Sequence, residues 1–260
     1  MFCQIPWWKR KLIGLSFKLF NILEDNWNAD FNHNGERYFV QNLLRAYKKK
    51  KKDSLVIFDV GAYEGHYSGM IRELSEKLGL YCEFHLFEPQ RFCYMKLCER
   101  FANNRHFHLN NFAVSEHSGE IFIYYEQDKR STGSVYRRNS GSQRELVRSE
   151  RLDKYIQEND VRIIDFLKID TEGNDYKVLI SLGEYLRNDF VYFIQFEYGE
   201  SYIHSHNNLF DFYDLLESRG FVLGKIRPCG VEIRKWHPKF ENYMYSNYVA
   251  ISQIALEFLF

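Results

Sequence analysis

The sequence lacks the features that mark several common classes of protein. Its 260 residues include 35 basic and 35 acidic side chains, so the formal net charge is zero. Proteins whose main partner is nucleic acid usually carry an excess of basic residues, and the balance therefore predicts no nucleic-acid partner. No segment approaches the run of about 20 apolar residues that a membrane-spanning helix requires. No internal repeat is evident either.

Cysteines are few, scattered and odd in number, and none shows the paired spacing of a zinc site. They are Cys3, Cys82, Cys93, Cys98 and Cys229. This pattern predicts reduced thiols in a cytoplasmic protein and gives no support for a metal site. A chain of this length can bury one sizeable core. We therefore expect one domain at residues 54–260, preceded by a helical appendage at residues 1–53.

The most informative segment that is present runs from residue 57 to residue 68. An apolar run rich in β-branched residues ends at Asp59, turns through Gly61-Ala62-Tyr63-Glu64-Gly65, and continues into a helical pattern. A second apolar run ends at Glu88. Glycines in such a turn let the backbone approach a ligand closely, and an acid about 20 to 30 residues later is where dinucleotide sites hold ribose hydroxyls. The segment predicts a site for a nucleoside-containing cofactor.

The glycine spacing restricts the choice of cofactor. A dinucleotide site needs G-x-G-x-x-G, but Ala62 and Tyr63 follow Gly61. A P-loop needs Lys and then Ser or Thr after its last glycine, but His66 follows Gly65. Phosphate binding is therefore disfavoured, and a cofactor with an adenosine and no phosphate, such as S-adenosylmethionine, fits best. In this interpretation Glu88 accepts hydrogen bonds from the ribose hydroxyls.

From residue 55 onward, strand patterns alternate with helical patterns, which is typical of an α/β fold with a parallel sheet between two layers of helices. The predicted strands are residues 55–59, 83–88, 106–110, 163–170, 190–197, 221–226 and 247–252. The predicted helices are residues 66–77, 90–103, 175–182 and 209–218. Between residues 114 and 161 the alternation stops. There, residues 120–126 predict an extra strand and residues 131–142 are rich in loop signals.

Several carboxylates end or follow these strands. Ligands of open α/β sheets bind beyond the carboxyl ends of the strands, so we expect the acids to share one cleft. If a methyl group is transferred to a hydroxyl, Asp170 is the first candidate for the base that accepts the proton. The other candidates are Glu172, Glu197, His204 and His206. Alternatively, Asp170 is a turn acid that binds backbone amides, or it shares a divalent cation with Glu172 and Glu197, although we predict no required metal.

Five arginines lie between residues 129 and 151, interleaved with Ser and Tyr. They are Arg130, Arg137, Arg138, Arg144 and Arg148. Guanidinium groups match phosphates and carboxylates in shape and charge, so this segment is a candidate clamp for an anionic group on the acceptor. A solvated, flexible loop explains the same composition.

The N-terminal segment, residues 1–23, combines basic residues with a helical apolar stripe. The stripe comprises Trp8, Leu12, Leu15, Leu19 and Ile22, and it needs a surface to cover it. That surface is the protein's own domain, a partner subunit in a homo-oligomer, or a membrane, which would make the protein peripheral at the inner membrane. A second helix is predicted at residues 35–47, and the lysines that follow it form its solvated end.

Taken in chain order, these motifs resemble the FkbM family of S-adenosylmethionine-dependent methyltransferases. The similar segments are FDVGA at 58–62, FEP at 87–89, NFAVS at 111–115, and, most specifically, RLDKYI at 151–156 followed by FLKIDTEG at 166–173. The resemblance covers about residues 54–197. It implies a class I methyltransferase fold, which is a Rossmann-like, doubly wound, mostly parallel sheet of seven strands whose last strand is antiparallel.

The resemblance also implies contacts with S-adenosylmethionine and methyl transfer to an oxygen of a sugar, a glycoconjugate precursor or another small metabolite. Together with the glycine turn, it gives these cofactor-binding candidates: Asp59, Gly61, Ala62, Tyr63, Gly65, Glu88, Pro89, Asn111 and Ala113. Two alternatives stay open. An NAD-dependent oxidoreductase would require a pyrophosphate loop that is not visible, and a catalytically inactive scaffold would bind the cofactor without turnover.

Overall fold

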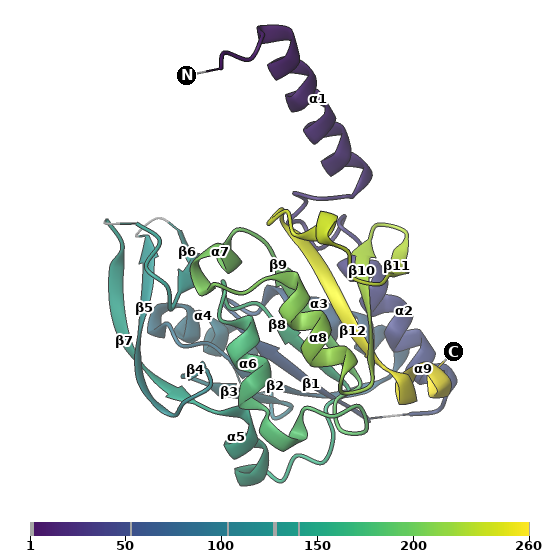
Figure 1. The fold of residues 1–260 in the computed structure, drawn as a ribbon. Helices are drawn as coiled ribbons and strands as arrows, with labels where there is room; N and C mark the ends of the chain where they lie inside the picture. Colours follow the sequence, from purple (N-terminus) through teal and green to yellow (C-terminus); the bar gives the residue numbers. More distant parts are fainter. Residues whose placement is uncertain (1–2, 53, 103, 127–128, 140, 260) are drawn as a thin grey trace.

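The computed structural model describes residues 3–52, 54–102, 104–126, 129–139 and 141–259. Its main sheet consists of β1 (Ser54–Val60), β2 (Tyr81–Phe87), β3 (Phe107–Asn110), β8 (Phe166–Ile169), β9 (Phe193–Tyr198), β10 (Phe221–Arg227), β11 (Gly230–Ile233) and β12 (Ser246–Ser252). The strands of this eight-stranded sheet follow the order β11-β10-β12-β9-β8-β1-β2-β3 (Figure 1).

Seven of these strands are the ones predicted from the sequence. β1, β2, β3, β8 and β9 pair in parallel, and β12 is antiparallel to both β9 and β10, as expected for the last strand. The expected count of seven is wrong by one strand, because β11 adds an antiparallel edge strand beside β10. β11 has only four residues, two of them exposed, so it lacks the apolar run by which a strand is recognised.

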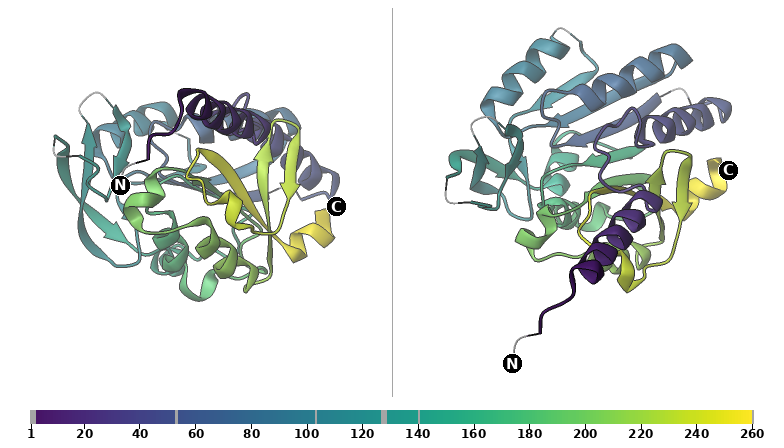
Figure 2. Two further views of the ribbon diagram at one scale, coloured as in Figure 1. Left: turned by 45° about the horizontal axis from the view of Figure 1, so that its top comes forward. Right: turned by 90° about the horizontal axis from the view of Figure 1, so that it is seen from above.

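Helices cover both faces of the sheet, as predicted (Figures 1 and 2). On one face, α2 (Glu36–Lys49), α3 (His66–Leu78) and α4 (Arg91–Phe101) supply core residues such as Leu43, Met70 and Leu97. On the other, α5 (Leu152–Glu158), α6 (Asp175–Ser181) and α8 (Leu209–Glu217) supply residues such as Val178 and Phe212. α2 thus shares a core with β1 and α3, so residues 36–49 pack as part of the sheet unit.

A second sheet occupies the region where the alternation stops. It contains β4 (Ala113–Val114), β5 (Gly119–Glu126), β6 (Lys129–Ser134) and β7 (Gln143–Glu150), in the order β4-β7-β5-β6. β5 is the predicted extra strand. The predicted loop at residues 131–142 is wrong at residues 131–134, which belong to β6, and β7 is a strand that was not predicted. Most side chains of β7 are polar and several are exposed, so backbone pairing with β5 holds this strand without an alternating apolar pattern.

The remaining elements are short except for α1 (Trp7–Leu23), which extends away from the body of the molecule (Figures 1 and 2). The short ones are α7 (Ser201–Ser205), α9 (Gln253–Leu259), η1 (Gly183–Tyr185) and η2 (Pro238–Phe240). Within the described ranges, no helix combines the length and the hydrophobicity needed to cross a bilayer. All five cysteines are free.

Candidate active site

The register of the parallel strands aligns their carboxyl ends along one edge of the main sheet. Val60 of β1 pairs with both Phe87 of β2 and Ile169 of β8, and Ile169 pairs with Phe196 of β9. The residues that follow these four are Gly61, Glu88, Asp170 and Glu197. The structure therefore places the candidate acids along the edge at which open α/β sheets bind their ligands.

Gly61 is required where the turn after β1 meets the turn after β8. Its φ is +85°, and a Cβ there would lie 1.9 Å from the carbonyl oxygen of Asp170. The amides of Gly61 and Ala62 both donate to the carbonyl of Phe87 at 3.0 Å. Only glycine fits so close an approach, and the three strand ends are consequently held together.

Glu88 has both carboxylate oxygens bound by backbone amides. Oε2 accepts from the amide of Tyr63 at 2.9 Å, and Oε1 accepts from the amide of Gln90 at 2.8 Å. The side chain is buried, and burial raises the pKa of Glu88 to about 7, although these two hydrogen bonds lower it. Each oxygen keeps a further acceptor position, so the carboxylate is held rigidly while it can still accept from a ligand.

A pocket opens beside this carboxylate. We call it the Glu88 pocket. Its lining includes Gly61, Tyr63, Glu88, Pro89, Phe112, Ala113, Ile123, Gly133, Asp170, Thr171, Glu172 and Asn174. Ile123 and Gly133 come from the second sheet, which therefore forms one wall. Sequence patterns did not predict this contribution.

The chemistry of the Glu88 pocket suits a ligand that donates hydrogen bonds and carries positive charge. No Lys or Arg is among its described lining residues, whereas Glu88, Asp170 and Glu172 are. Two buried atoms in the lining, Thr171 Oγ1 and Asn174 Oδ1, have no hydrogen-bond partner among the described residues. A pyrophosphate would meet only like charge here, so the pocket does not suit a dinucleotide. Hydroxyl and amino groups of an adenosine, and a cationic sulfonium, fit the same donor set.

Two further pockets adjoin the Glu88 pocket through shared lining residues. The Lys168 pocket shares Gly61, Tyr63 and Asp170 with it, and its lining also includes Phe31, Glu36, Asp59, Ala62, Tyr67, Lys168 and Tyr245. The Glu197 pocket shares Glu172 with it. Its lining also includes Trp27, Arg138, Glu197, Glu200, Ser201, Tyr243, Met244 and Tyr245. The three pockets surround the segment from Asp170 to Glu172.

The carboxylates of this segment are held by side chains. Asp170 lies 3.0 Å from Nζ of Lys168 and leaves 38% of its side chain exposed. Glu172, which adopts a φ of +55°, pairs with Nη2 of Arg138 at 2.6 Å. Burial and the charge of Asp170 raise the pKa of Glu172, and burial, Asp170 and Glu172 together raise the pKa of Glu197 well above its usual value. Among the described residues, the oxygens of these three acids do not converge on a common metal position.

Lys168 is the centre of a buried polar network that the sequence analysis did not identify. Burial by itself would lower its pKa, but the carboxylates of Asp170, Glu36 and Asp59 raise it above the usual value. Burial raises the pKa of Asp59 to about 6, although the hydroxyl of Ser68 donates to its carboxylate. A lysine inside the apolar strand run FLKI was the available signal, since a buried ammonium requires acidic partners.

Glu36 of α2 completes this network from the N-terminal region. Its carboxylate accepts from the side-chain amides of Asn34, Gln195 and Asn247. Gln195 in turn accepts from the hydroxyl of Tyr67 at 2.7 Å. The polar network thus joins residues from α2, α3, β9 and β12, of which Glu36 and Tyr67 line the Lys168 pocket.

Four predicted site residues do not line any of the three pockets. Gly65 caps α3, where a Cβ would meet the side chains of Leu97 and Phe101. Asn111 uses its side-chain amide to donate to the carbonyls of Glu88 and Pro89, so it supports the wall from outside. His204 is exposed on α7 and His206 is exposed directly after it, and neither lines a pocket with the carboxylates.

The described arginines of residues 129–151 contact different partners and do not form one clamp. Arg138 alone among them joins the carboxylates, through Glu172. Arg148 pairs with Glu150, and Arg144 lies 4.4 Å from the ring centre of Phe122. Arg137 donates to the backbone of Asn139, and the side chain of Arg130 lies outside the described part of the chain.

The strand order, the single antiparallel strand within the seven predicted strands, and a pocket at the carboxyl edge define a class I methyltransferase fold. The sequence matches the family described as Methyltransferase FkbM domain over residues 59–223, which is more than half of the chain. The protein belongs to the FkbM methyltransferase family. A search among curated proteins found no match.

Solved structures align with this chain at low sequence identity. Methyltransferase FkbM from Methylobacillus flagellatus KT aligns with a TM-score of 0.50 and 16% identity, over 76% of this chain and 44% of that one. Fibrillarin from Aeropyrum pernix, solved with natively bound S-adenosyl-L-methionine, aligns with a TM-score of 0.42 and 10% identity, over 81% and 76% of the two chains. The chain thus spans less than half the length of the first of these proteins.

Proposed function

We propose that this protein transfers a methyl group from S-adenosylmethionine to a hydroxyl oxygen of a saccharide or glycoconjugate precursor. The observation that carries the proposal is the shared lining of the three pockets. Asp170 lines both the Glu88 pocket and the Lys168 pocket, and Glu172 lines both the Glu88 pocket and the Glu197 pocket. A donor beside Glu88 and an acceptor beside Glu197 would therefore meet at Glu172, two residues after Asp170.

The residues of the Glu88 pocket would hold the donor. The Glu88 carboxylate would accept from the ribose hydroxyls, and the unpaired atoms of Thr171 and Asn174 would gain partners. When bound, S-adenosylmethionine supplies a methyl group that is already activated by the positive sulfonium. The task left to the protein is mainly to align the acceptor and exclude competing water.

Asp170 is the residue we assign as the base. A hydroxyl must lose its proton during transfer, and the acceptor of that proton has to be within hydrogen-bond reach. Asp170 is the more exposed of the two carboxylates that link the pockets, at 38% against 19% for Glu172. The raised pKa of Glu197 favours its protonated form, which suits hydrogen bonding to the acceptor better than proton removal.

The lining of the Glu197 pocket supports a sugar as acceptor. Trp27, Tyr243 and Tyr245 offer rings, while Glu172, Glu197 and Arg138 offer hydrogen-bonding groups. Aromatic faces combined with carboxylates match the alternation of C–H faces and hydroxyls in a pyranose. The same groups are too acidic to favour a phosphorylated acceptor.

The donor assignment can be tested by calorimetric titration of S-adenosylmethionine and, separately, of NAD. We expect only S-adenosylmethionine to bind, and Glu88→Gln to weaken it by about 1.5 to 3 kcal/mol, roughly tenfold to a hundredfold. Glu83→Gln is the matched control, because Glu83 lies on the same strand, well before the pocket, and leaves 37% of its side chain exposed. NAD binding, or equal affinities for the two variants, would contradict the assignment.

The acceptor assignment requires a readout of the methylated atom. Incubation with S-adenosylmethionine carrying a ¹³C-methyl group, followed by carbon NMR of a saccharide and glycolipid fraction, should give an oxygen-bound methyl carbon. Asp170→Asn should abolish this signal while donor binding persists. A methyl group on nitrogen or carbon would overturn the acceptor class. Bound donor without any S-adenosylhomocysteine formed would favour an inactive scaffold.

A further inference from the structure

Helix α1 leaves its apolar side chains uncovered. Trp8, Leu12, Leu15, Leu19 and Ile22 expose between 53% and 63% of their surface. Among the described residues of α1, Asn21 is the only buried one. Figures 1 and 2 show the helix projecting from the body, with no element packed along its length. So large an apolar surface on a folded protein marks a docking site.

The uncovered residues form one continuous stripe. Trp8, Leu12, Leu15, Leu19 and Ile22 are separated by four, three, four and three positions, a spacing that keeps them on one side of the helix. Such a stripe suits either a second copy of the helix in a coiled coil or the boundary between the headgroups and acyl chains of a membrane. The charges beside the stripe distinguish these partners.

Those charges are all positive. Lys9, Arg10, Lys11 and Lys18 lie on α1, and no acidic residue precedes Glu24. Lys11 and Lys18 flank one side of the stripe and Lys9 and Ser16 the other, the positions that face each other across a coiled coil. A second copy would therefore offer these lysines no acidic partner. Anionic lipid headgroups are complementary, since lysine stems can lie along the apolar surface while the ammonium groups reach the phosphates.

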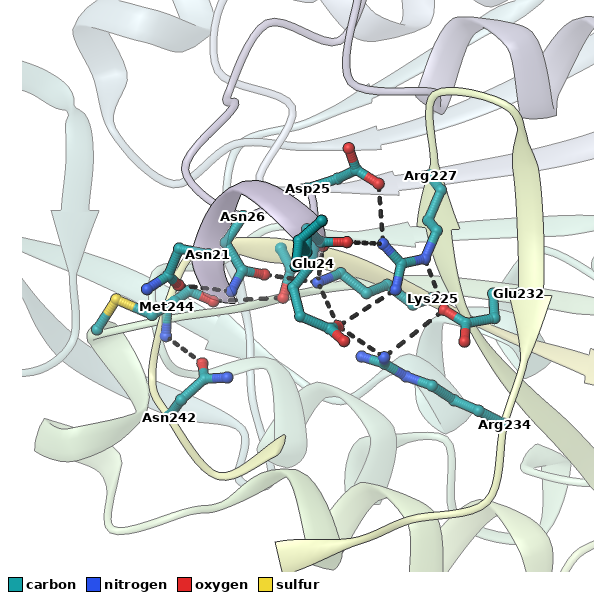
Figure 3. Close-up of polar contacts among 12 residues, drawn as sticks. Asn21, Glu24, Asp25, Asn26, Lys225, Arg227, Glu232, Arg234, Asn242 and Met244 are labelled. Carbon is teal, nitrogen blue, oxygen red and sulfur yellow. Dashed lines mark hydrogen bonds and ion pairs between the residues drawn. The ribbon is translucent and has the colours of Figure 1, made fainter. Parts of the chain in front are cut away.

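The base of α1 is firmly attached to the body, as Figure 3 shows. The buried ammonium of Lys225 donates to the carbonyl of Glu24 and to Oδ1 of Asn26, each at 2.5 Å. The carboxylate of Glu24 also lies 2.8 Å from Arg234, and that of Asp25 lies 2.8 Å from Arg227. These partners lie on or just after the hairpin of β10 and β11. The helix is thus a fixed projection, not a loose tail.

We propose that α1 docks on an anionic membrane surface, with the Trp8 to Ile22 stripe in the interface and the flanking lysines at the headgroups. The helix leaves the body at the carboxyl edge of the main sheet, where Trp27, three residues after Glu24, lines the Glu197 pocket. Docking therefore brings the pocket-bearing edge to the lipid surface. This inference concerns where the enzyme works and holds whichever acceptor it methylates.

Co-sedimentation of the full chain with vesicles tests the proposal. We expect binding to phosphatidylcholine vesicles that contain phosphatidylglycerol, and roughly tenfold less binding to phosphatidylcholine alone or in high salt. Leu15→Glu combined with Leu19→Glu should lower binding at least roughly tenfold. Lys11→Gln with Lys18→Gln should lower only the part that depends on anionic lipid. Leu146→Glu on β7 is the matched control, because Leu146 is 52% exposed on the second sheet.

Three results would overturn the proposal. The first is that the wild type stays in the supernatant. The second is that the wild type and the Leu15→Glu, Leu19→Glu variant sediment equally. The third is that the wild type binds neutral and anionic vesicles equally. Light scattering in the absence of lipid tests whether a second copy covers the stripe instead. A stable dimer in the wild type that is lost in the Leu15→Glu, Leu19→Glu variant would assign the stripe to a second copy. Unchanged circular dichroism and unchanged titration with S-adenosylmethionine would show that the variants remain folded.

Discussion

The two sides of the active site hold their carboxylates by different means. Both oxygens of Glu88 are bound by backbone amides, those of Tyr63 and Gln90, which lie in the turns that follow β1 and β2. Asp170 and Glu172 depend instead on the side chains of Lys168 and Arg138. A backbone amide persists through substitution, whereas a side-chain partner does not. The donor side is therefore a property of the fold, and the acceptor side is a property of particular residues.

Among the variants that test this difference, Lys168→Met should have the largest effect. The variant leaves Asp59, Asp170 and Glu36 without their shared ammonium, and uncompensated buried charge costs on the order of 3 to 5 kcal/mol in free energy of unfolding. Urea unfolding measures the loss. Lys77→Met is the matched control, since Lys77 pairs with Glu73 while leaving 65% of its side chain exposed. Its loss should stay below about 1 kcal/mol. Equal losses would show that the acceptor side does not depend on Lys168.

The pH dependence of donor binding tests the other side. In the proposed function, ribose hydroxyls would donate to the ionised form of Glu88, whose pKa is raised to about 7 by burial. Below pH 7 a proton must leave before the donor binds, so affinity for S-adenosylmethionine should rise roughly tenfold per pH unit up to that pH and then level off. Glu88→Gln should flatten the profile measured by calorimetry. If the slope persists in this variant, another acid governs binding, with Asp59 and its pKa of about 6 the first to examine.

The smallest expected effect belongs to Arg138→Gln. The guanidinium and carboxylate of the Arg138 and Glu172 pair retain 28% and 19% exposure, so its loss should change the free energy of unfolding by about 1 kcal/mol or less. Donor affinity should stay within roughly twofold, while the acceptor KM rises several-fold because Glu172 loses its orientation. Steady-state kinetics separates the two parameters, and Arg144→Gln is the control. Equal changes in donor and acceptor binding would remove the distinction between the two sides.

The donor side was predictable from the sequence because its determinants are local. A strand, a glycine turn and an acid at the end of the next strand are visible as a pattern, and the register of β1 and β2 then places Gly61 and Glu88 together. The same logic located Asp170 and Glu197. The glycines illustrate the limit of this logic. Gly61 and Gly65 are needed for close packing against Asp170 and against Phe101, which the motif by itself could not distinguish from contact with a ligand.

The rest could not be predicted because it depends on pairing between distant segments. β7 has few buried apolar residues and is held by backbone bonds to β5, and Glu36 finds its partners on β9 and β12. α1 and α2 make the same point, since both showed helical apolar stripes. The stripe of α2 contributes Phe39, Leu43 and Leu44 to the core, whereas that of α1 is exposed. A stripe predicts that something covers a helix, but not what covers it.

The bonds of Glu36 also have a kinetic consequence. Its partners Gln195 and Asn247 lie 159 and 211 residues further along the chain. Closing loops of that length costs entropy, and only the contacts of the assembled sheet offset this cost. Contacts of high sequence separation therefore form late in folding. Glu36 on α2 therefore lacks one of its partners until β12 is in place, although Glu36 lines the Lys168 pocket. A chain released before β12 is complete would carry every residue of the Glu88 motif and still lack a finished active site.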